Sequence, residues 1–216
     1  MKVCTDSCIF GAYINPKDAN NILDIGSGSG LLALMVAQRS SSNITAIEID
    51  EQAAQQAREN FESSPWNDRL TIFCDDVLNF SQQNLKFDLI ISNPPFYTNH
   101  LKSPDQAINN AMHCDSLTLK NLACVVDRLL SGLGTFEVML PEYEMKLLTQ
   151  FLQEFKFLES NRLVIKNDER SNPLRIISSF SRNSKICIQN QLCIRNEIAD
   201  YTTDFKDLLK HYYLHL

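Results

Sequence analysis

NILDIGSGSGLLALMVAQR, residues 21–39, is the stretch that decides the fold of this chain. It begins with a short apolar run that contains β-branched residues, continues through alternating glycines, and ends in a strongly helix-forming segment. Gly26, Gly28 and Gly30 allow a tight turn and a close approach of the backbone to a ligand, directly before a helix N-terminus. The stretch therefore predicts a strand, a ligand-binding loop and a helix, and its GxGxG spacing differs from the GxGxxG of dinucleotide-binding proteins.

Short apolar strands and helices alternate along the rest of the chain. We expect strands at 21–25, 44–49, 70–74, 87–92, 134–140, 161–166 and 174–181, and helices at 31–39, 51–62, 116–131 and 142–155. This alternation predicts an α/β fold, Rossmann-like, with a mainly parallel seven-stranded sheet and helices on both faces. No linker or internal repeat interrupts the pattern, so we expect one domain over residues 1–216.

Length and composition limit the class of protein. The 216 residues, 44% of them hydrophobic and 21% charged, suffice for a folded core and exclude a disordered chain. No apolar stretch is long enough for a membrane helix, and the first residues lack the apolar core of a signal peptide. The seven cysteines are scattered and form no CxxC pair. We therefore expect a cytoplasmic protein with reduced thiols, no membrane partner and no metal.

The net charge of −6 is unevenly distributed. Residues 156–195 hold eight Lys and Arg against three Asp and Glu, on an otherwise acidic chain. Such a segment can bind phosphate groups, or it can be an ordinary solvated strand face, and both interpretations stay open at this point. The basic residues are Lys156, Arg162, Lys166, Arg170, Arg175, Arg182, Lys185 and Arg195.

Acidic residues lie at the ends of the first three expected strands, at the sheet edge where ligands bind in this kind of fold. Asp24 can accept a hydrogen bond from an ammonium group or cap the turn. Glu48 is our candidate for a bidentate contact with a ribose, whereas Asp50 fits the N-cap of the next helix. Either Asp75 or Asp76 can accept from the amino group of a cofactor's adenine, and we favour Asp76.

Apolar and glycine residues complete this expected cofactor site. Ile49 and Val77 follow the second and third strands, and we expect them to sandwich the adenine ring. The loop between the first strand and its helix contributes Gly26, Ser27, Gly28 and Gly30.

The fourth expected strand ends in Asn93-Pro94-Pro95-Phe96-Tyr97, the most specific signal in the chain. The prolines fix the backbone and remove N–H donors, so the Pro94 carbonyl and the Asn93 side chain aim acceptors at one point. An amino group on an aromatic ring is a poor nucleophile, and two acceptors favour the pyramidal geometry that it needs for attack. We therefore expect catalysis at Asn93, Pro94, Pro95 and Phe96, with Phe96 and Tyr97 against a planar substrate.

Together these motifs resemble the S-adenosylmethionine-dependent methyltransferases of the Rossmann-like class, in the amino-group branch with an NPP(Y/F) loop. A narrower resemblance is to the bacterial valine-tRNA adenine-N6-methyltransferases, which act beside the anticodon at tRNA position 37. It covers nearly the whole chain. The segments that carry it are MKVCTDSCIFGAY at 1–13, LDIGSGSGLLALMVAQR at 23–39, SPW at 64–66, FDLIISNPPFY at 87–97 and YTTDFKDLLKHYYL at 201–214.

The resemblance implies S-adenosyl-L-methionine as cofactor, tRNA as partner and a monomeric methyltransferase domain. Residues 1–92 would form its cofactor-binding half, and residues 93–216 would form the NPPF loop and the target-binding half. In that family the segment that matches Thr5 and Asp6 lies over the methionine part of the cofactor, so both are candidates, and Asn93 joins them at the cofactor. Arg170 and Arg175 are our first choices for contacts with tRNA phosphates.

Two departures from the family pattern concern the start of the chain. The family usually has glycines where this chain has Cys4 and Ser7, so we expect a different backbone there. Its members generally begin earlier, with an aromatic and basic lead-in, and we expect its absence to weaken cofactor closure and the grip on tRNA.

Other enzymes of the same branch are the main alternatives. They methylate guanine N2 in rRNA, adenine N6 in DNA, or the glutamine N5 of a protein. DNA enzymes usually carry a target-recognition insertion, and glutamine enzymes usually carry an N-terminal helical domain; we find neither here. A non-catalytic RNA-binding module is a further alternative, which the NPPF loop beside complete cofactor motifs disfavours.

Overall fold

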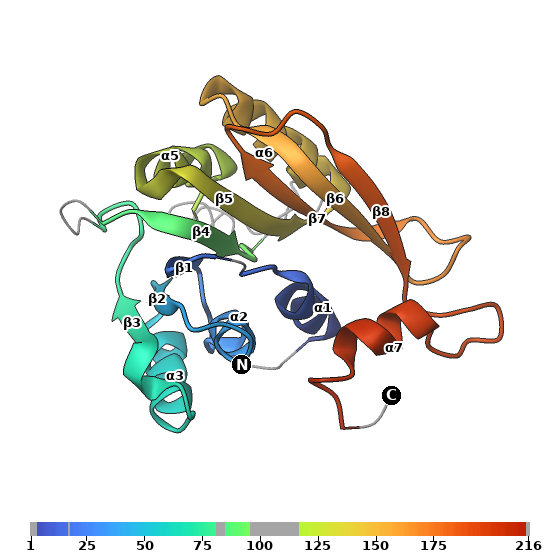
Figure 1. Ribbon diagram of the computed structural model, residues 1–216, viewed down its shortest axis with the longest axis horizontal. Helices are drawn as coiled ribbons and strands as arrows, with labels where there is room; N and C mark the ends of the chain where they lie inside the picture. The colour runs from blue at the N-terminus through green and yellow to red at the C-terminus, as the bar shows by residue number, and fades with distance from the viewer. Residues whose placement is uncertain (1–3, 17, 81–84, 96–116, 215–216) are drawn as a thin grey trace, which may run out of the picture.

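The computed structural model describes residues 4–16, 18–80, 85–95 and 117–214. Its strands form one sheet in the order β3-β2-β1-β4-β5-β7-β6-β8, with helices on both faces (Figure 1). The strands are β1 (Asn21–Ile25), β2 (Asn43–Glu48), β3 (Leu70–Cys74), β4 (Phe87–Ser92), β5 (Leu130–Leu140), β6 (Leu158–Lys166), β7 (Pro173–Ser181) and β8 (Ile188–Cys193). The helices are α1 (Thr5–Tyr13), α2 (Leu31–Ala37), α3 (Glu51–Glu62), α5 (Leu119–Leu129), α6 (Glu142–Glu154) and α7 (Thr203–Leu209), with a 3-10 turn at Asn67–Arg69.

The α/β class and the mainly parallel sheet are as predicted, but the predicted number of seven strands is wrong because β8 adds an eighth. β8 pairs with β6 in parallel at the edge of the sheet. Its first four residues, Ile188 to Gln191, are exposed and mostly polar. An edge strand with little burial lacks the apolar pattern that marks a strand in the sequence.

β7 runs against the other strands of this sheet, since it pairs antiparallel with both β5 and β6. β1 to β5 therefore end at one edge of the sheet, where β7 begins and where β6 and β8 end. We call this edge the carboxyl edge. It gathers residues from distant parts of the sequence, and the candidate site lies along it.

Two apolar layers hold the helices on the sheet. The helices α1, α2, α3 and α7 cover one face, and Phe10, Phe61 and Phe205 pack there. The helices α5 and α6 cover the other face, with Phe136 and Leu148 in the core. In the part of the chain described by the structure, no helix has both the length and the apolar character that crossing a membrane requires.

Candidate active site

The glycine loop leaves β1 in the left-handed conformation that glycine adopts without strain. The φ angles of Gly26, Gly28 and Gly30 are 70°, 56° and 79°. A Cβ at Gly26 would have no heavy atom within 4 Å, whereas a Cβ at Gly30 would lie 2.4 Å from the Phe61 ring. Gly30 is thus required for packing of the loop on α3, and Gly26 borders open space.

Glu48, the last residue of β2, braces the glycine loop. Its Oε2 accepts from the Gly28 N–H at 2.7 Å, and its Oε1 accepts from the Asp50 N–H at 3.0 Å. Each carboxylate oxygen has a second lone pair, so both can still accept from hydroxyl groups. Asp50 accepts from the Ala53 N–H at 2.8 Å, which confirms its predicted role as the N-cap of α3.

Asp24 is a fully buried carboxyl group next to this loop. Neither of its oxygens has a hydrogen-bond partner among the described residues. Burial raises the pKa of Asp24 to about 7, and Glu48 adds to the rise. The nearby Ala33 N–H, which does not have the geometry of a regular hydrogen bond, acts in the opposite direction. An unpaired buried carboxyl group is costly, so this side chain is a strong candidate for a ligand contact.

The ends of β2 and β3 present the residues predicted for the adenine. Ile49 is 58% exposed, while Val77 is 6% exposed and packs in the core. Asp76 Oδ1 accepts from the Leu78 N–H at 2.9 Å, and Asp75 Oδ1 accepts from the Asp76 N–H at 2.8 Å. Both acids therefore shape their own turn, and the structure leaves the choice between them open.

Asn93 and Pro94 follow β4 directly beside the glycine loop. The Ser92 hydroxyl donates to the Ile25 carbonyl at 2.9 Å and so ties the end of β4 to the end of β1. Pro94 is buried, Pro95 is exposed, and Asn93 is half-buried. Phe96 and Tyr97, the predicted substrate contacts, lie outside the described residues.

The first turn of α1 lies against the same region. Asn93 Nδ2 donates to the Ser7 hydroxyl at 3.1 Å. Asp6 forms an ion pair with Arg175 at the start of β7, with 3.1 Å between Oδ2 and Nε. Thr5 is exposed at the beginning of the helix. The structure thus brings Asp6, predicted for the cofactor, together with Arg175, predicted for tRNA.

The sheet topology divides the basic segment into two groups. Lys166, Arg170, Arg175 and Arg195 lie at the carboxyl edge, whereas Lys156, Arg182 and Lys185 lie at the opposite edge. Arg170 pairs with Glu197, and both side chains are more than 80% exposed. The group at the carboxyl edge is the one that a substrate at Asn93 could reach.

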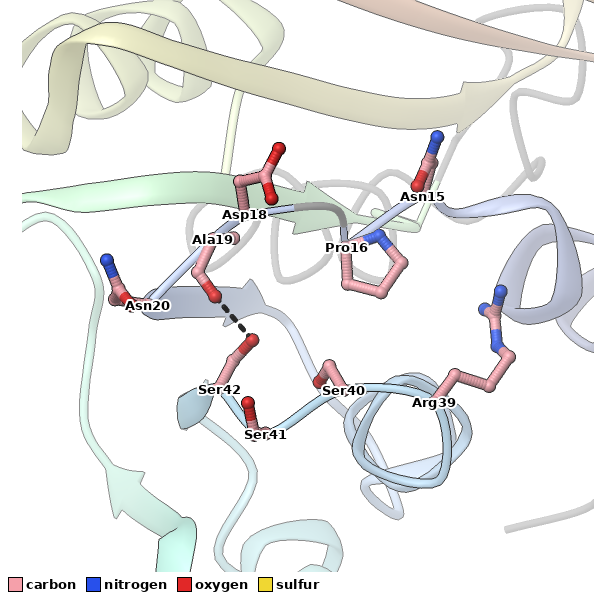
Figure 2. A pocket seen from close by; sticks show the side chains of 9 residues that line it. All are labelled: Asn15, Pro16, Asp18, Ala19, Asn20, Arg39, Ser40, Ser41 and Ser42. Atoms are coloured by element: carbon pink, nitrogen blue, oxygen red, sulfur yellow. Dashed lines mark hydrogen bonds between the residues drawn. The ribbon is translucent and has the colours of Figure 1, made fainter.

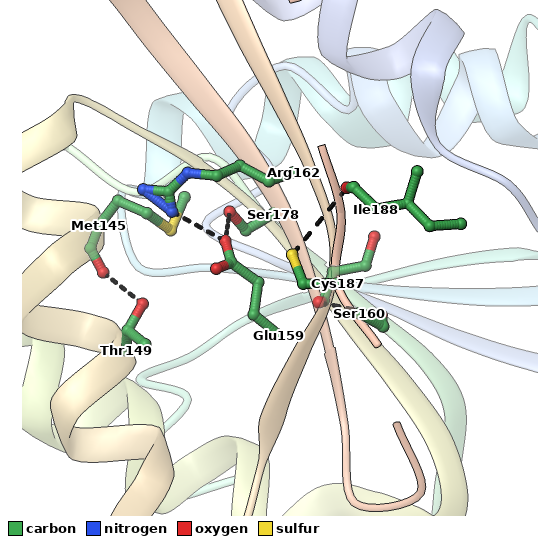
Figure 3. A network of polar contacts seen from close by, with 9 residues as sticks. Met145, Thr149, Glu159, Ser160, Arg162, Ser178, Cys187 and Ile188 are labelled. Carbon is green, nitrogen blue, oxygen red and sulfur yellow. Dashed lines mark hydrogen bonds and ion pairs between the residues drawn. The ribbon is translucent and has the colours of Figure 1, made fainter. Parts of the chain in front are cut away.

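Arg162 belongs to neither group. It lies on the face of β6 that α6 covers and pairs with Glu159, with 3.0 Å between Nη1 and Oε1. Glu159 also accepts from the Ser178 hydroxyl, as Figure 3 shows. Arg162 is therefore held by Glu159 on the face of the sheet that α6 covers.

A polar hollow of about 480 Å³ opens at the opposite edge, where β1 and β2 begin (Figure 2). Two of its polar side chains are engaged within the fold: the Ser42 hydroxyl donates to the Ala19 carbonyl at 2.6 Å, and Arg39 donates to the carbonyls of Gly11 and Ile14. Within the described residues, no group of three or more His, Cys, Asp or Glu side chains is placed to hold a metal ion.

Comparisons with known proteins point to one family. The family model of the methyltransferase small domain matches residues 5–121. A tRNA1(Val) (adenine(37)-N6)-methyltransferase from Bacteroides thetaiotaomicron is 40% identical over 100% of this chain and 92% of that protein. Proteins of the same name from Flavobacterium psychrophilum and Pectobacterium carotovorum are 38% and 36% identical over 99% of this chain, and over 93% and 88% of their own length. The chain belongs to the tRNA1(Val) (adenine(37)-N6)-methyltransferase family.

Several solved structures share the fold of this chain. A protein from Agrobacterium tumefaciens described as a predicted O-methyltransferase has a TM-score of 0.74, with 16% identity over 98% of both chains. A ribosomal protein L11 methylase from Lactobacillus delbrueckii has a TM-score of 0.56, with 20% identity over 82% of this chain and 76% of that one. The Rossmann-like methyltransferase fold is therefore as predicted.

One residue of the candidate site, Ser7, was not predicted from the sequence. In the sequence, Ser7 stands out only as a departure from the glycine that the family usually has there. Its partner Asn93 lies 86 positions away, so no local spacing connects the two. Only the packing of α1 across the carboxyl edge reveals the contact.

Proposed function

We propose that this chain transfers a methyl group from S-adenosyl-L-methionine to N6 of the adenine at position 37 of tRNA1(Val). The observation that carries the proposal is the position of Asn93 and Pro94 next to the Gly26 loop, in a chain that matches relatives of that name over nearly their full length. We propose further that it acts as a cytoplasmic monomer. Residues 1–92 would then serve mainly the cofactor, and residues 93–216 the target.

The residues present fit the cofactor. Gly26 borders open space, Asp24 is buried without a partner among the described residues, and Ile49 exposes an apolar face. Asp24 would accept from the ammonium group of the cofactor, Glu48 would accept from the ribose hydroxyls, and Ile49 would lie against the adenine. When bound, the cofactor supplies an electrophilic methyl group on a sulfonium centre.

The catalytic work of the chain itself falls to Asn93 and Pro94. Asn93 Oδ1 and the Pro94 carbonyl would each accept one hydrogen of the target amino group. These two hydrogen bonds would hold the nitrogen lone pair out of conjugation with the ring and offset the positive charge that develops on it. Preorganised acceptors of this kind act in the chemical step more than in binding.

The experiment uses purified protein, labelled S-adenosylmethionine and transcripts of tRNA1(Val) with adenine or guanine at position 37. We expect label only with adenine, and we expect Asn93→Ala to lower the single-turnover rate by about 100-fold with cofactor affinity nearly intact. Equal labelling of the guanine transcript would contradict the assigned position. Labelling of rRNA, DNA or release factor in place of tRNA would favour another member of the amino-group branch.

A further inference from the structure

The amide of Asn93 can serve the reaction in one orientation only. Its oxygen accepts hydrogen bonds, whereas its NH2 group can only donate them. A target amino group also presents hydrogens, so an amide turned by about 180° would set donor against donor. The two orientations of the amide have nearly the same shape, so packing alone does not distinguish them. A hydrogen-bond partner therefore has to hold Oδ1 toward the target.

Ser7 provides that discrimination when its hydroxyl hydrogen points to another acceptor, because a hydroxyl that is free to rotate could equally donate to Oδ1. Asn93 Nδ2 donates to Ser7 Oγ at 3.1 Å, and this is the one hydrogen bond of the Asn93 side chain within the described residues. Because the NH2 group is engaged by the hydroxyl, Oδ1 is the atom that remains to accept. Ser7 Oγ also lies 3.1 Å from the Cys4 sulfur. If the hydroxyl donates its hydrogen to that sulfur, its oxygen lone pairs are left to accept from Asn93.

The first turn of α1 has the rigidity that such a role requires. Directly after Ser7, the side chains of Cys8, Ile9 and Phe10 are buried in the core. Directly before it, Asp6 is paired with Arg175 at 3.1 Å, and both side chains are largely shielded from solvent. The hydroxyl of Ser7 is thus fixed from both sides relative to the end of β4.

We infer that Ser7 is a positioning residue, which orients the Asn93 amide so that its oxygen faces the target amino group. The inference rests on the proposed function, since it assigns Ser7 a part in that reaction.

The test compares Ser7→Ala and Ser7→Thr with the parent protein in single-turnover methylation of the tRNA1(Val) transcript. We expect Ser7→Ala to lower the rate constant about 3- to 10-fold, the effect of removing one neutral hydrogen bond, with KM for tRNA and cofactor affinity within about twofold. Ser7→Thr keeps the hydroxyl and should retain most of the rate. Ser41→Ala, an exposed serine at the opposite edge, is the matched control.

A double-mutant cycle separates positioning from a general effect on α1. In the Asn93→Ala background, Ser7→Ala should cause no further loss of rate, because the residue that it orients is gone. An unchanged rate in Ser7→Ala, an equal fall in both backgrounds, or a parallel fall in cofactor affinity would each overturn the inference. If the parent protein does not methylate the transcript at all, it is the proposed function that fails.

Discussion

Under the proposed function, Asp24 would link the stability of the fold to the binding of the cofactor. Its pKa is raised from an ordinary 3.8 to about 7, because burial disfavours the ionised form. Folding therefore favours the protonated carboxyl group. The stability that follows is fully present below about pH 4 and is lost as the pH rises through about 7. A cofactor ammonium, by contrast, needs the ionised form that the fold disfavours.

The affinity for S-adenosylmethionine should accordingly rise with pH. Calorimetry between about pH 6 and pH 8 should show an increase approaching tenfold for the parent protein, because the ionised fraction of a group with a pKa near 7 rises by about that factor. Asp24→Asn should bind more weakly and lose this pH dependence. A flat profile in the parent protein would exclude Asp24 as the titrating group.

Glu137 offers a matched control for this measurement. It is buried on β5, its pKa is also raised to about 7 by burial, and Ile91 of β4 separates it from Asp24 across the sheet. It lies beside Tyr13 and Asn15, at the end of α1 away from the site. Glu137→Gln should therefore reduce the fall in stability between about pH 4 and pH 7 but leave the pH dependence of cofactor affinity unchanged.

At the scale of the elements, the glycine loop and α3 depend on one another. A methyl group at Gly30 would lie 2.4 Å from Phe61 Cε1 and 3.3 Å from Ala57 Cβ, at a φ of 79°. Left-handed strain and overpacking together should make Gly30→Ala less stable by about 2–4 kcal/mol in chemical unfolding. Gly132→Ala on β5 is the control, since its new methyl group meets nothing within 4 Å. Equal stability of the two variants would show that the loop can shift away from α3.

The elements that the sequence predicts well are those whose burial imposes a pattern. The bounds of β1, β3, β4 and α3 agree with the predicted ranges. β1 and β4 are central parallel strands that are buried on both faces, and Asp50 marks the start of α3. The edge strand β3 is marked instead by its β-branched and aromatic residues. β8 has no such pattern, since four of its six residues are exposed. The residues of the site were predictable where they follow a strand, because parallel strands end at the same edge. The hydrogen bond between Ser7 and Asn93 was not, because it depends on how a helix packs across that edge.

At the scale of the whole molecule, topology decides which charges lie near the site. β7 runs against its neighbours, so a continuous basic stretch of sequence is separated onto two edges of the sheet. Arg175 is engaged with Asp6 and would couple any interaction with phosphate to the position of α1. Arg170 is more accessible: it lies in the turn between β6 and β7, is largely exposed, and has a solvated partner in Glu197, an ion pair of little energetic weight.

Binding of tRNA should therefore depend on Arg170 and not on Lys185, an exposed lysine of the same basic segment at the opposite edge. Arg170→Glu should weaken the binding of all tRNAs about equally. The slope of log K against log salt concentration should become less negative by about 0.7–0.9 for each phosphate that the variant no longer neutralises.

Lys185→Glu makes the same change in net charge, so a purely global charge effect would lower affinity equally in both variants. If the two variants behave alike, the carboxyl-edge group is a solvated face and the tRNA docks on another surface. A selective effect of Arg170 would instead place the phosphate backbone along the edge that also holds Asn93.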